Sequence, residues 1–320
     1  MPERPIHAAT RALVKAGFAG DGSLFTPERA VWTAAVADDL RLRFVDPPRL
    51  EKESFTETVE RKLHGAPTET VQLLGELLFL HLLAPSNVGA PAKKALLSRV
   101  LAAAAEPIPV PSGLDSALGD GFANVGRAYV AYRDRQIGWL VRLVQAWKAL
   151  PPDSRRQALD DPWTFRGIVD SIPVMTAYSQ RNALLHLTFP AVFEAIVSRT
   201  HKQQIVDAFA DEPTERSGDV DRDLLALRHH LEAARGGPVD FYHGDLTARW
   251  RPVKEQLPGY APDLNPVEGV WSVMRGGLAN LVPGGIDQLA ALIRARLKPM
   301  QYRPGVLEGC LAGTGLFLDP

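Results

Sequence analysis

The chain has 320 residues, of which 46% are hydrophobic and 23% are charged, and its formal net charge is −1. This length and apolar content suffice for one large or two ordinary domains with a hydrophobic core, and they exclude disorder over the whole chain. Because the net charge is near zero, any binding to nucleic acid must depend on a local basic patch.

The single cysteine, Cys310, excludes an internal disulfide and a cysteine-based zinc cluster, as is typical of a reducing compartment. The first residues form no cationic and apolar leader, and no apolar run reaches about 18 residues, so we expect neither a signal peptide nor a membrane span. These features predict a soluble, cytoplasmic protein with no membrane partner.

Residues 1–235 read mostly as helices with clear stop signals. Thr26-Pro27-Glu28 combines an N-cap with proline at the first helical position, which predicts a helix over 26–41. The apolar stretch 73–84 contains Glu76 and His81 and is typical of a buried helix. Further helices are predicted over 54–64, 68–84, 91–106, 124–150, 154–159, 176–187, 200–210 and 219–235.

The helix predicted over 124–150 is the longest. Its apolar residues, Trp139 and Trp147 among them, recur at helical spacing and indicate a core helix. Arg135, Arg142 and Lys148 are interspersed at positions that we expect to face solvent.

The composition changes at Arg235-Gly236-Gly237-Pro238, after which glycine and proline are frequent and the predicted helices are short. We therefore expect three parts: an N-terminal helical extension over 1–53, a helical region over 54–246 and a short C-terminal segment over 247–320.

The string from Leu257 to Trp271 contains Asn265-Pro266-Val267-Glu268. Asn265 is a suitable N-cap and Pro266 a suitable first helical residue, and Glu268 stands where its carboxylate can return to the cap in a capping box. A purely structural role for this spacing is therefore a strong alternative to a functional one.

Together with Leu278-Ala279-Asn280-Leu281 and Arg303-Pro304-Gly305-Val306-Leu307, this string resembles the C-terminal end of mariner-like DDE insertion-sequence transposases, over about 253–317. The resemblance implies an RNase H-like fold, a function in DNA transposition and recombination, and Glu268 as the third of three metal-binding carboxylates. Such chemistry needs two Mg²⁺ ions about 4 Å apart, held by several carboxylates.

The two other acids of the DDE pattern have no clear counterpart. In the family the second acid ends an apolar strand about thirty residues before the glutamate, and here that distance reaches Ala233-Ala234-Arg235, in a predicted helix. Asp240 and Asp245 lie too close to Glu268. We therefore expect an incomplete catalytic domain that binds no cofactor, with magnesium only if a complete site forms.

A second resemblance covers about 54–246. Asp160-Asp161-Pro162-Trp163, 180–187, Phe189-Pro190, 193–199, His201-Lys202 and Asp240-Phe241-Tyr242 look like the helical region that precedes the ATPase module of McrB-like AAA+ restriction proteins. The chain has no Gly-Lys dipeptide, so it has no Walker A loop. The resemblance implies an adaptor without its motor, and it suggests DNA, a partner ATPase or self-association as binding partners.

Several basic residues are candidates for nucleic-acid contacts, although a basic helix end is usually only a solvated surface. His186 is more typical of a hydrogen-bonded core histidine than of a metal ligand, and the adjacent His229 and His230 point to different helix faces. The candidate basic residues are Arg199, Lys202, Arg294, Arg296 and Lys298.

The sequence thus predicts a mainly α protein, in which a helical bundle domain precedes a small α/β remnant of an RNase H-like transposase domain. Its expected function is that of a transposase-like, catalytically incomplete chimaera, with Glu268 as the one catalytic and metal-binding residue. The alternative is a non-enzymatic helical adaptor or DNA-binding module related to AAA+ restriction systems.

Overall fold

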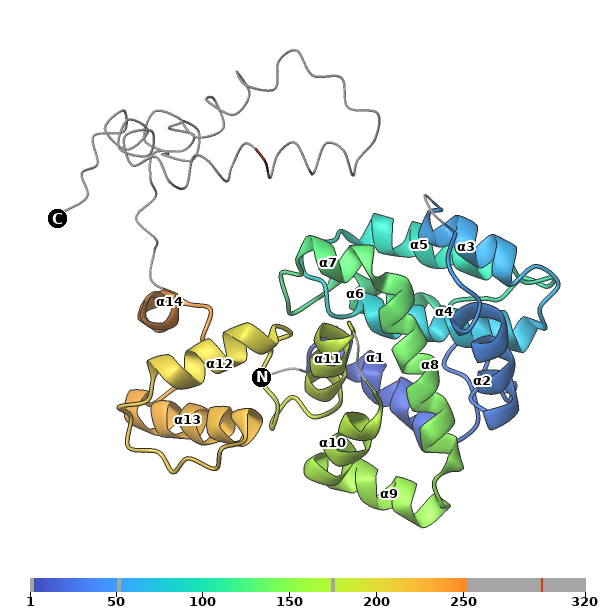
Figure 1. Cartoon of the computed structure of the whole chain (residues 1–320). Helices are drawn as coiled ribbons and strands as arrows, with labels where there is room; N and C mark the ends of the chain where they lie inside the picture. Colours follow the sequence, from blue (N-terminus) through green and yellow to red (C-terminus); the bar gives the residue numbers. More distant parts are fainter. Residues whose placement is uncertain (1–2, 51–52, 174–175, 252–294, 296–320) are drawn as a thin grey trace. The chain divides into compact units, whose positions relative to one another are not determined.

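The computed structural model describes residues 3–50, 53–173 and 176–251, together with Ala295. The chain divides into two units, Met1–Arg251 and Pro252–Pro320, and Figure 1 shows the first as an assembly of helices and loops. The described residues form no β-strand, and an isolated bridge joins Pro85 to Ala123. The prediction of a mainly helical fold is confirmed for these residues. The predicted α/β remnant lies almost entirely outside them.

The described residues form fourteen α-helices, two π-helical turns (η1 and η2) and one 3₁₀ turn (η3). In chain order these are α1 (Pro5–Leu13), η1 (Val14–Phe18), α2 (Ala34–Leu40), η2 (Arg41–Val45), α3 (Phe55–Lys62), α4 (Thr68–Leu82), α5 (Ala90–Leu101), η3 (Ser112–Leu114), α6 (Asp115–Gly119), α7 (Arg127–Ala131), α8 (Arg133–Ala149), α9 (Pro152–Asp160), α10 (Pro162–Ser171), α11 (Tyr178–Thr188), α12 (Arg199–Ala208), α13 (Val220–Arg235) and α14 (Gly244–Trp250).

Helix α4 lies at the centre of the first unit, in contact with α2, α5, α8 and α11. Every residue from Thr70 to Leu82 is buried, so the prediction of a buried helix over this stretch is confirmed. Its two unexpected polar residues are satisfied by hydrogen bonds, as buried polar groups generally must be. His81 Nδ1 lies 2.7 Å from Gln180 Oε1, and Glu76 accepts hydrogen bonds from the loop before α2.

That loop shows why the helix predicted over 26–41 begins only at Ala34. Glu76 accepts from the backbone N–H of Leu24 at 3.1 Å and from Trp32 Nε1 at 2.6 Å. The N–H of Thr26 is bonded to Ser23 Oγ at 2.9 Å. A buried carboxylate with several donors thus holds residues 23–33 as a loop, and Thr33 provides the N-cap of α2.

The first 53 residues share the core of the residues that follow them. One apolar cluster extends from Ile6 to Phe193 and includes residues on both sides of position 53. On α8, Trp147 Nε1 donates to the carbonyl oxygen of Phe18 and Lys148 Nζ to that of Gly17, both at 2.7 Å. The predicted boundary at 53/54 therefore does not separate two cores.

Helices α12, α13 and α14 enclose a second apolar cluster, which includes Phe209, Leu227 and Trp250. Helices α12 and α13 correspond to those predicted over 200–210 and 219–235. Helix α13 ends at Gly236, whose φ of 69° is the left-handed conformation that glycine adopts most readily. The described part of the chain thus contains a large helical body and a small three-helix bundle.

None of the described helices combines the length and apolar character that crossing a membrane requires.

Candidate functional site

A groove with a volume of about 670 Å³ lies beside α8, where this helix packs against η2 and α2. Figure 1 shows α2 and α8 together in the large helical body. The volume falls within the range of roughly 300–1,000 Å³ that is common for ligand sites. The groove is lined by Phe44, Val45, Pro47, Pro48, Arg49, Lys62, Ala131, Tyr132, Asp134, Arg135, Gly138, Trp139, Arg142, Pro173, Thr176 and Ala177.

The lining carries an excess of positive charge. Its charged side chains are Arg49, Lys62, Arg135 and Arg142 against the single carboxylate Asp134. The nearest ion pairs are loose: Arg49 lies 3.8 Å from Asp134, and Arg142 lies 3.9 Å from Asp46. Both distances exceed the roughly 2.7–2.9 Å of a charge-assisted hydrogen bond.

Arg135 is the most available of these cations. Its side chain is exposed, and no carboxylate of a described residue forms an ion pair with it within 4.0 Å. Arg142 follows seven residues later, two turns along the same face of α8. These two guanidinium groups therefore form a basic edge beside the groove.

Lys62 has a different role, because it stabilises the wall of the groove. Its ammonium group donates to the carbonyl oxygens of Phe44, at 2.7 Å, and Pro47, and it lies 5.4 Å from the centre of the Phe44 ring. Burial lowers the pKa of Lys62, and the charge of Arg61 lowers it further. These contacts fix the loop after η2 against α3.

A break between α7 and α8 places Tyr132 at the groove. The sequence predicts one helix over 124–150, but Tyr132 has φ −102° and ψ 28°, which ends α7 before α8 begins. The buried Gln136 donates from Nε2 to the carbonyl oxygen of Tyr129 at 3.0 Å. In a continuous helix this carbonyl would accept from the N–H of Arg133, so the glutamine side chain replaces the missing backbone bond.

Tyr132 is 42% exposed, and the guanidinium carbon of Arg135 lies 4.9 Å from the centre of its ring. The two other aromatic residues of the lining, Phe44 and Trp139, are almost fully buried, at 2% and 3% exposure. The indole Nε1 of Trp139 is buried with no hydrogen-bond partner among the described residues. The groove thus combines a cationic edge, one exposed ring and an apolar floor.

The sequence-predicted residues Glu268, Arg294, Arg296 and Lys298 lie outside the described residues. Within the described ranges, no group of three or more His, Cys, Asp or Glu side chains is placed to hold a metal ion. The predicted magnesium site, which depends on Glu268, therefore stays a prediction.

Arg199 and Lys202 are both on α12 but have different environments. Arg199 is exposed, and its guanidinium carbon lies 5.2 Å from the centre of the Tyr178 ring. Lys202 is only 1% exposed, and its ammonium group lies 2.7 Å from the carboxylate of Asp221. Burial lowers the pKa of Lys202, and the nearby Asp221 opposes that shift. Lys202 is therefore not presented to a phosphate, whereas the surface role predicted for Arg199 stays a prediction.

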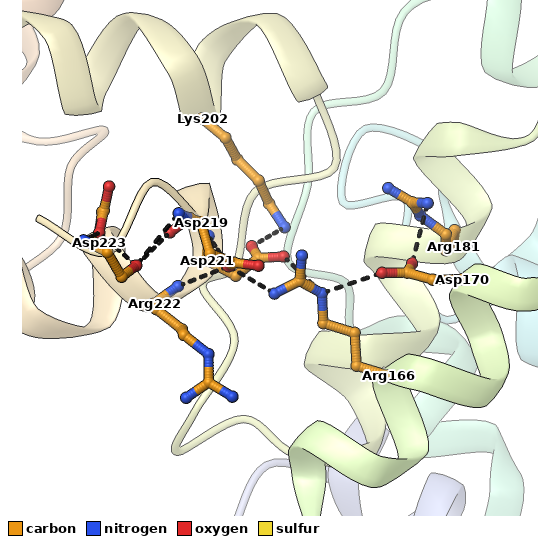
Figure 2. A network of polar contacts seen from close by, with 9 residues as sticks. Arg166, Asp170, Arg181, Lys202, Asp219, Asp221, Arg222 and Asp223 are labelled. Atoms are coloured by element: carbon orange, nitrogen blue, oxygen red, sulfur yellow. Dashed lines mark hydrogen bonds and ion pairs between the residues drawn. The ribbon is translucent and has the colours of Figure 1, made fainter.

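Lys202 belongs to an ionic network that joins the small bundle to the large helical body (Figure 2). Arg166 on α10 lies 2.6 Å from Asp219 and 3.6 Å from Asp221, both at the start of α13. It also lies 3.3 Å from Asp170, which pairs with Arg181 on α11 at 2.9 Å. Each of these charged groups is paired with another side chain of the protein, so we interpret the network as a structural feature and not as a ligand site.

His186 is a hydrogen-bonded core histidine, as predicted. It is 7% exposed, and its Nδ1 lies 2.8 Å from the carbonyl oxygen of Phe193. Burial lowers its pKa to about 4, so the ring is neutral near pH 7.

No family model, no curated protein and no solved structure matches this chain. The candidate site therefore rests on its own geometry.

The groove residues were missed as a site because each of them has an ordinary explanation in the sequence. Arg135 and Arg142 fit the polar face of an ordinary helix. The one signal in the sequence is their seven-residue spacing, with Gly138 between them, which places both arginines on the same side of the helix. The break at Tyr132 and the position of the loop after η2 come from tertiary contacts, which the helical periodicity does not reveal.

Proposed function

We propose that the large helical body is a non-enzymatic binding module that holds a single-stranded nucleic acid in the groove beside α8. The observation that carries this proposal is the cationic edge formed by Arg135 and Arg142, which border a groove with an exposed tyrosine. Arg135 has no carboxylate partner within 4.0 Å among the described residues, and Arg142 has a loose ion pair with Asp46 at 3.9 Å. In a chain with a net charge of −1, this edge is a local basic patch.

The concave shape favours a single strand over a duplex. Sites for single strands combine cations that follow the backbone with an aromatic surface for the bases, and the groove has both. Duplex DNA is instead read by a helix or ribbon that projects into its major groove. Helix α8 cannot project in this way, because most of it is buried.

The proposal predicts that the two arginines set both the affinity and its salt dependence. Binding of a labelled oligothymidylate to the full chain is measured by fluorescence anisotropy over a series of salt concentrations. The double variant Arg135→Gln/Arg142→Gln should bind more weakly, and the slope of log K against log salt should become shallower by about 0.7 for each phosphate that the variant no longer neutralises.

The matched control is Arg11→Gln/Arg156→Gln, which removes two exposed arginines that do not line the groove. Its affinity and salt slope should equal those of the unchanged chain. Absence of binding to the unchanged chain, or an equal decrease in both double variants, would contradict the proposal.

For residues 253–317 we propose, from the resemblance to DDE transposases, an incomplete catalytic segment in which Glu268 is a metal ligand without its two partner acids. The support is the Asn265-Pro266-Val267-Glu268 string itself. We expect no magnesium-dependent or manganese-dependent nicking or strand transfer by the purified chain. Cleavage that Glu268→Gln abolishes would show that the other ligands exist. A partner ATPase also stays a prediction.

A further inference from the structure

We propose that Tyr132 stacks on a base of the strand bound in the groove, so that the groove selects strands with unpaired bases over other polyanions. This inference rests on the proposed function, because the phosphates must first be held by Arg135 and Arg142. It goes further by assigning the selectivity to one residue.

The position of Tyr132 carries the inference. The residue lies at the break between α7 and α8, lines the groove and keeps 42% of its surface exposed. Aromatic rings are usually buried, because exposure of their apolar surface to water is unfavourable. Gln136 satisfies the carbonyl group of Tyr129 that the break leaves without a helical partner, so the backbone at Tyr132 can depart from helical geometry at little cost.

Arg135 supports the same inference. Its guanidinium carbon lies 4.9 Å from the centre of the Tyr132 ring, a cation–π distance. Arg135 thus lies over one face of the ring, and a base would stack on the opposite face, with this cation close by for a neighbouring phosphate. Arg142 lies about 10 Å further along the helix axis, at a rise of about 1.5 Å per residue, so the two arginines are spaced for different phosphates of one strand.

The surroundings of Tyr132 also distinguish it from a chance exposed residue. Among the described residues, the exposed large hydrophobic side chains are Leu42, Leu50, Val130, Tyr132 and Tyr242. All except Tyr242 lie on η2, on the loop after it or at the α7–α8 junction, the segments that supply most of the groove lining. Of these five side chains, only Tyr132 lines the groove itself, so it is the one among them that can offer an apolar face to a base held there.

The test compares an oligothymidylate with an abasic oligomer of equal length and with poly-L-glutamate, as competitors of a labelled oligothymidylate on the full chain. We expect the oligothymidylate to compete about 5- to 150-fold better than the abasic strand, which is the factor that stacking of one base on an aromatic side chain contributes to affinity. A duplex of the same length should also compete poorly, because its bases are already stacked on one another.

The variants separate stacking from general damage. Tyr132→Phe should retain the preference for bases, and Tyr132→Leu should bring the ratio between the two strands close to one. Tyr242→Leu changes the other exposed tyrosine of the group above and should leave the ratio unchanged. Circular dichroism and thermal melting of each variant verify that it is folded.

Each further outcome overturns a defined statement. If the unchanged chain binds both strands equally, while Arg135→Gln/Arg142→Gln weakens both, the groove holds a polyanion without contacting its bases and only this inference fails. If neither strand binds, the proposed function fails with it. If poly-L-glutamate competes as well as the oligothymidylate, the partner is an acidic protein segment, and both proposals are wrong.

Discussion

Two basic residues of α12, Arg199 and Lys202, show how far burial decides the role of a charge. They are three residues apart and both follow the cap residue Ser198. Arg199 is exposed beside Tyr178, whereas Lys202 is enclosed and paired with Asp221. Removing an ammonium group from water without a partner costs several kcal/mol of free energy, so the burial of Lys202 depends on its ion pair with Asp221.

We therefore predict opposite results for the two residues. Lys202→Met should lower the free energy of unfolding by about 3 kcal/mol, because Asp221 is left buried with only the more distant Arg166 beside it, at 3.6 Å. Arg199→Ala should change it by less than about 0.5 kcal/mol, as is usual for surface positions. Urea unfolding of the full chain measures both values.

The double variant Lys202→Met/Asp221→Leu distinguishes the effect of the ion pair from that of the side-chain shape. It should recover most of the stability, because an apolar pair of similar volume replaces a buried ion pair at little cost. A Lys202→Met variant as stable as the unchanged chain would contradict the burial of this charge.

At the scale of single elements, two instances of one capping pattern have different outcomes. Asp161-Pro162 begins a helix: Asp161 accepts from the backbone N–H groups of Trp163 and Thr164, and α10 follows. Thr26-Pro27, which the sequence predicts as a helix start, lies in a loop because Ser23 and Glu76 bond the nearby backbone. The second result depends on a residue about 50 positions away, so local sequence does not reveal it.

Most helices with strong periodicity could be predicted, whereas the groove could not. The predicted helices over 54–64 and 68–84 agree closely with α3 and α4, since the apolar spacing and end signals of the first and the apolar run of the second act locally. The groove depends on the break at Tyr132, which the buried Gln136 stabilises, and on the loop that Lys62 holds. These contacts form only after the helices pack.

At the scale of the whole described unit, polar contacts join the small bundle to the large helical body. Besides the network around Arg166, Arg228 on α13 pairs with Glu194 at 2.6 Å, and Asn182 on α11 donates to the carbonyl oxygen of Val197 at 3.0 Å. All lining residues of the groove beside α8 lie between Phe44 and Ala177, in the large body. The small bundle is therefore not needed to form the cationic edge.

Two buried histidines of the large body predict how the stability of the fold depends on pH. Burial lowers the pKa of His81 to about 3, with a further contribution from the charge of Arg133, and that of His186 to about 4. Both values lie below the roughly 6.5 of an unfolded histidine, so the unfolded chain binds more protons below that pH. The free energy of unfolding should therefore fall as the pH falls from about 6.5 towards 4, by up to about 1.4 kcal/mol per pH unit for each histidine.

Urea unfolding of the full chain between about pH 7 and pH 5 measures this slope. His81→Gln and His186→Gln should each make the slope of the free energy of unfolding against pH less steep, because each removes one group that gains a proton on unfolding. This expectation concerns the slope alone and holds for any change in stability at pH 7. The control is Arg199→Gln, which replaces an exposed residue whose guanidinium group stays protonated over this pH range, and it should leave the slope unchanged. If the slope is the same in both core variants, other groups cause the acid sensitivity. The two rings would then gain their protons in the folded protein, and their pKa values would not be lowered by burial.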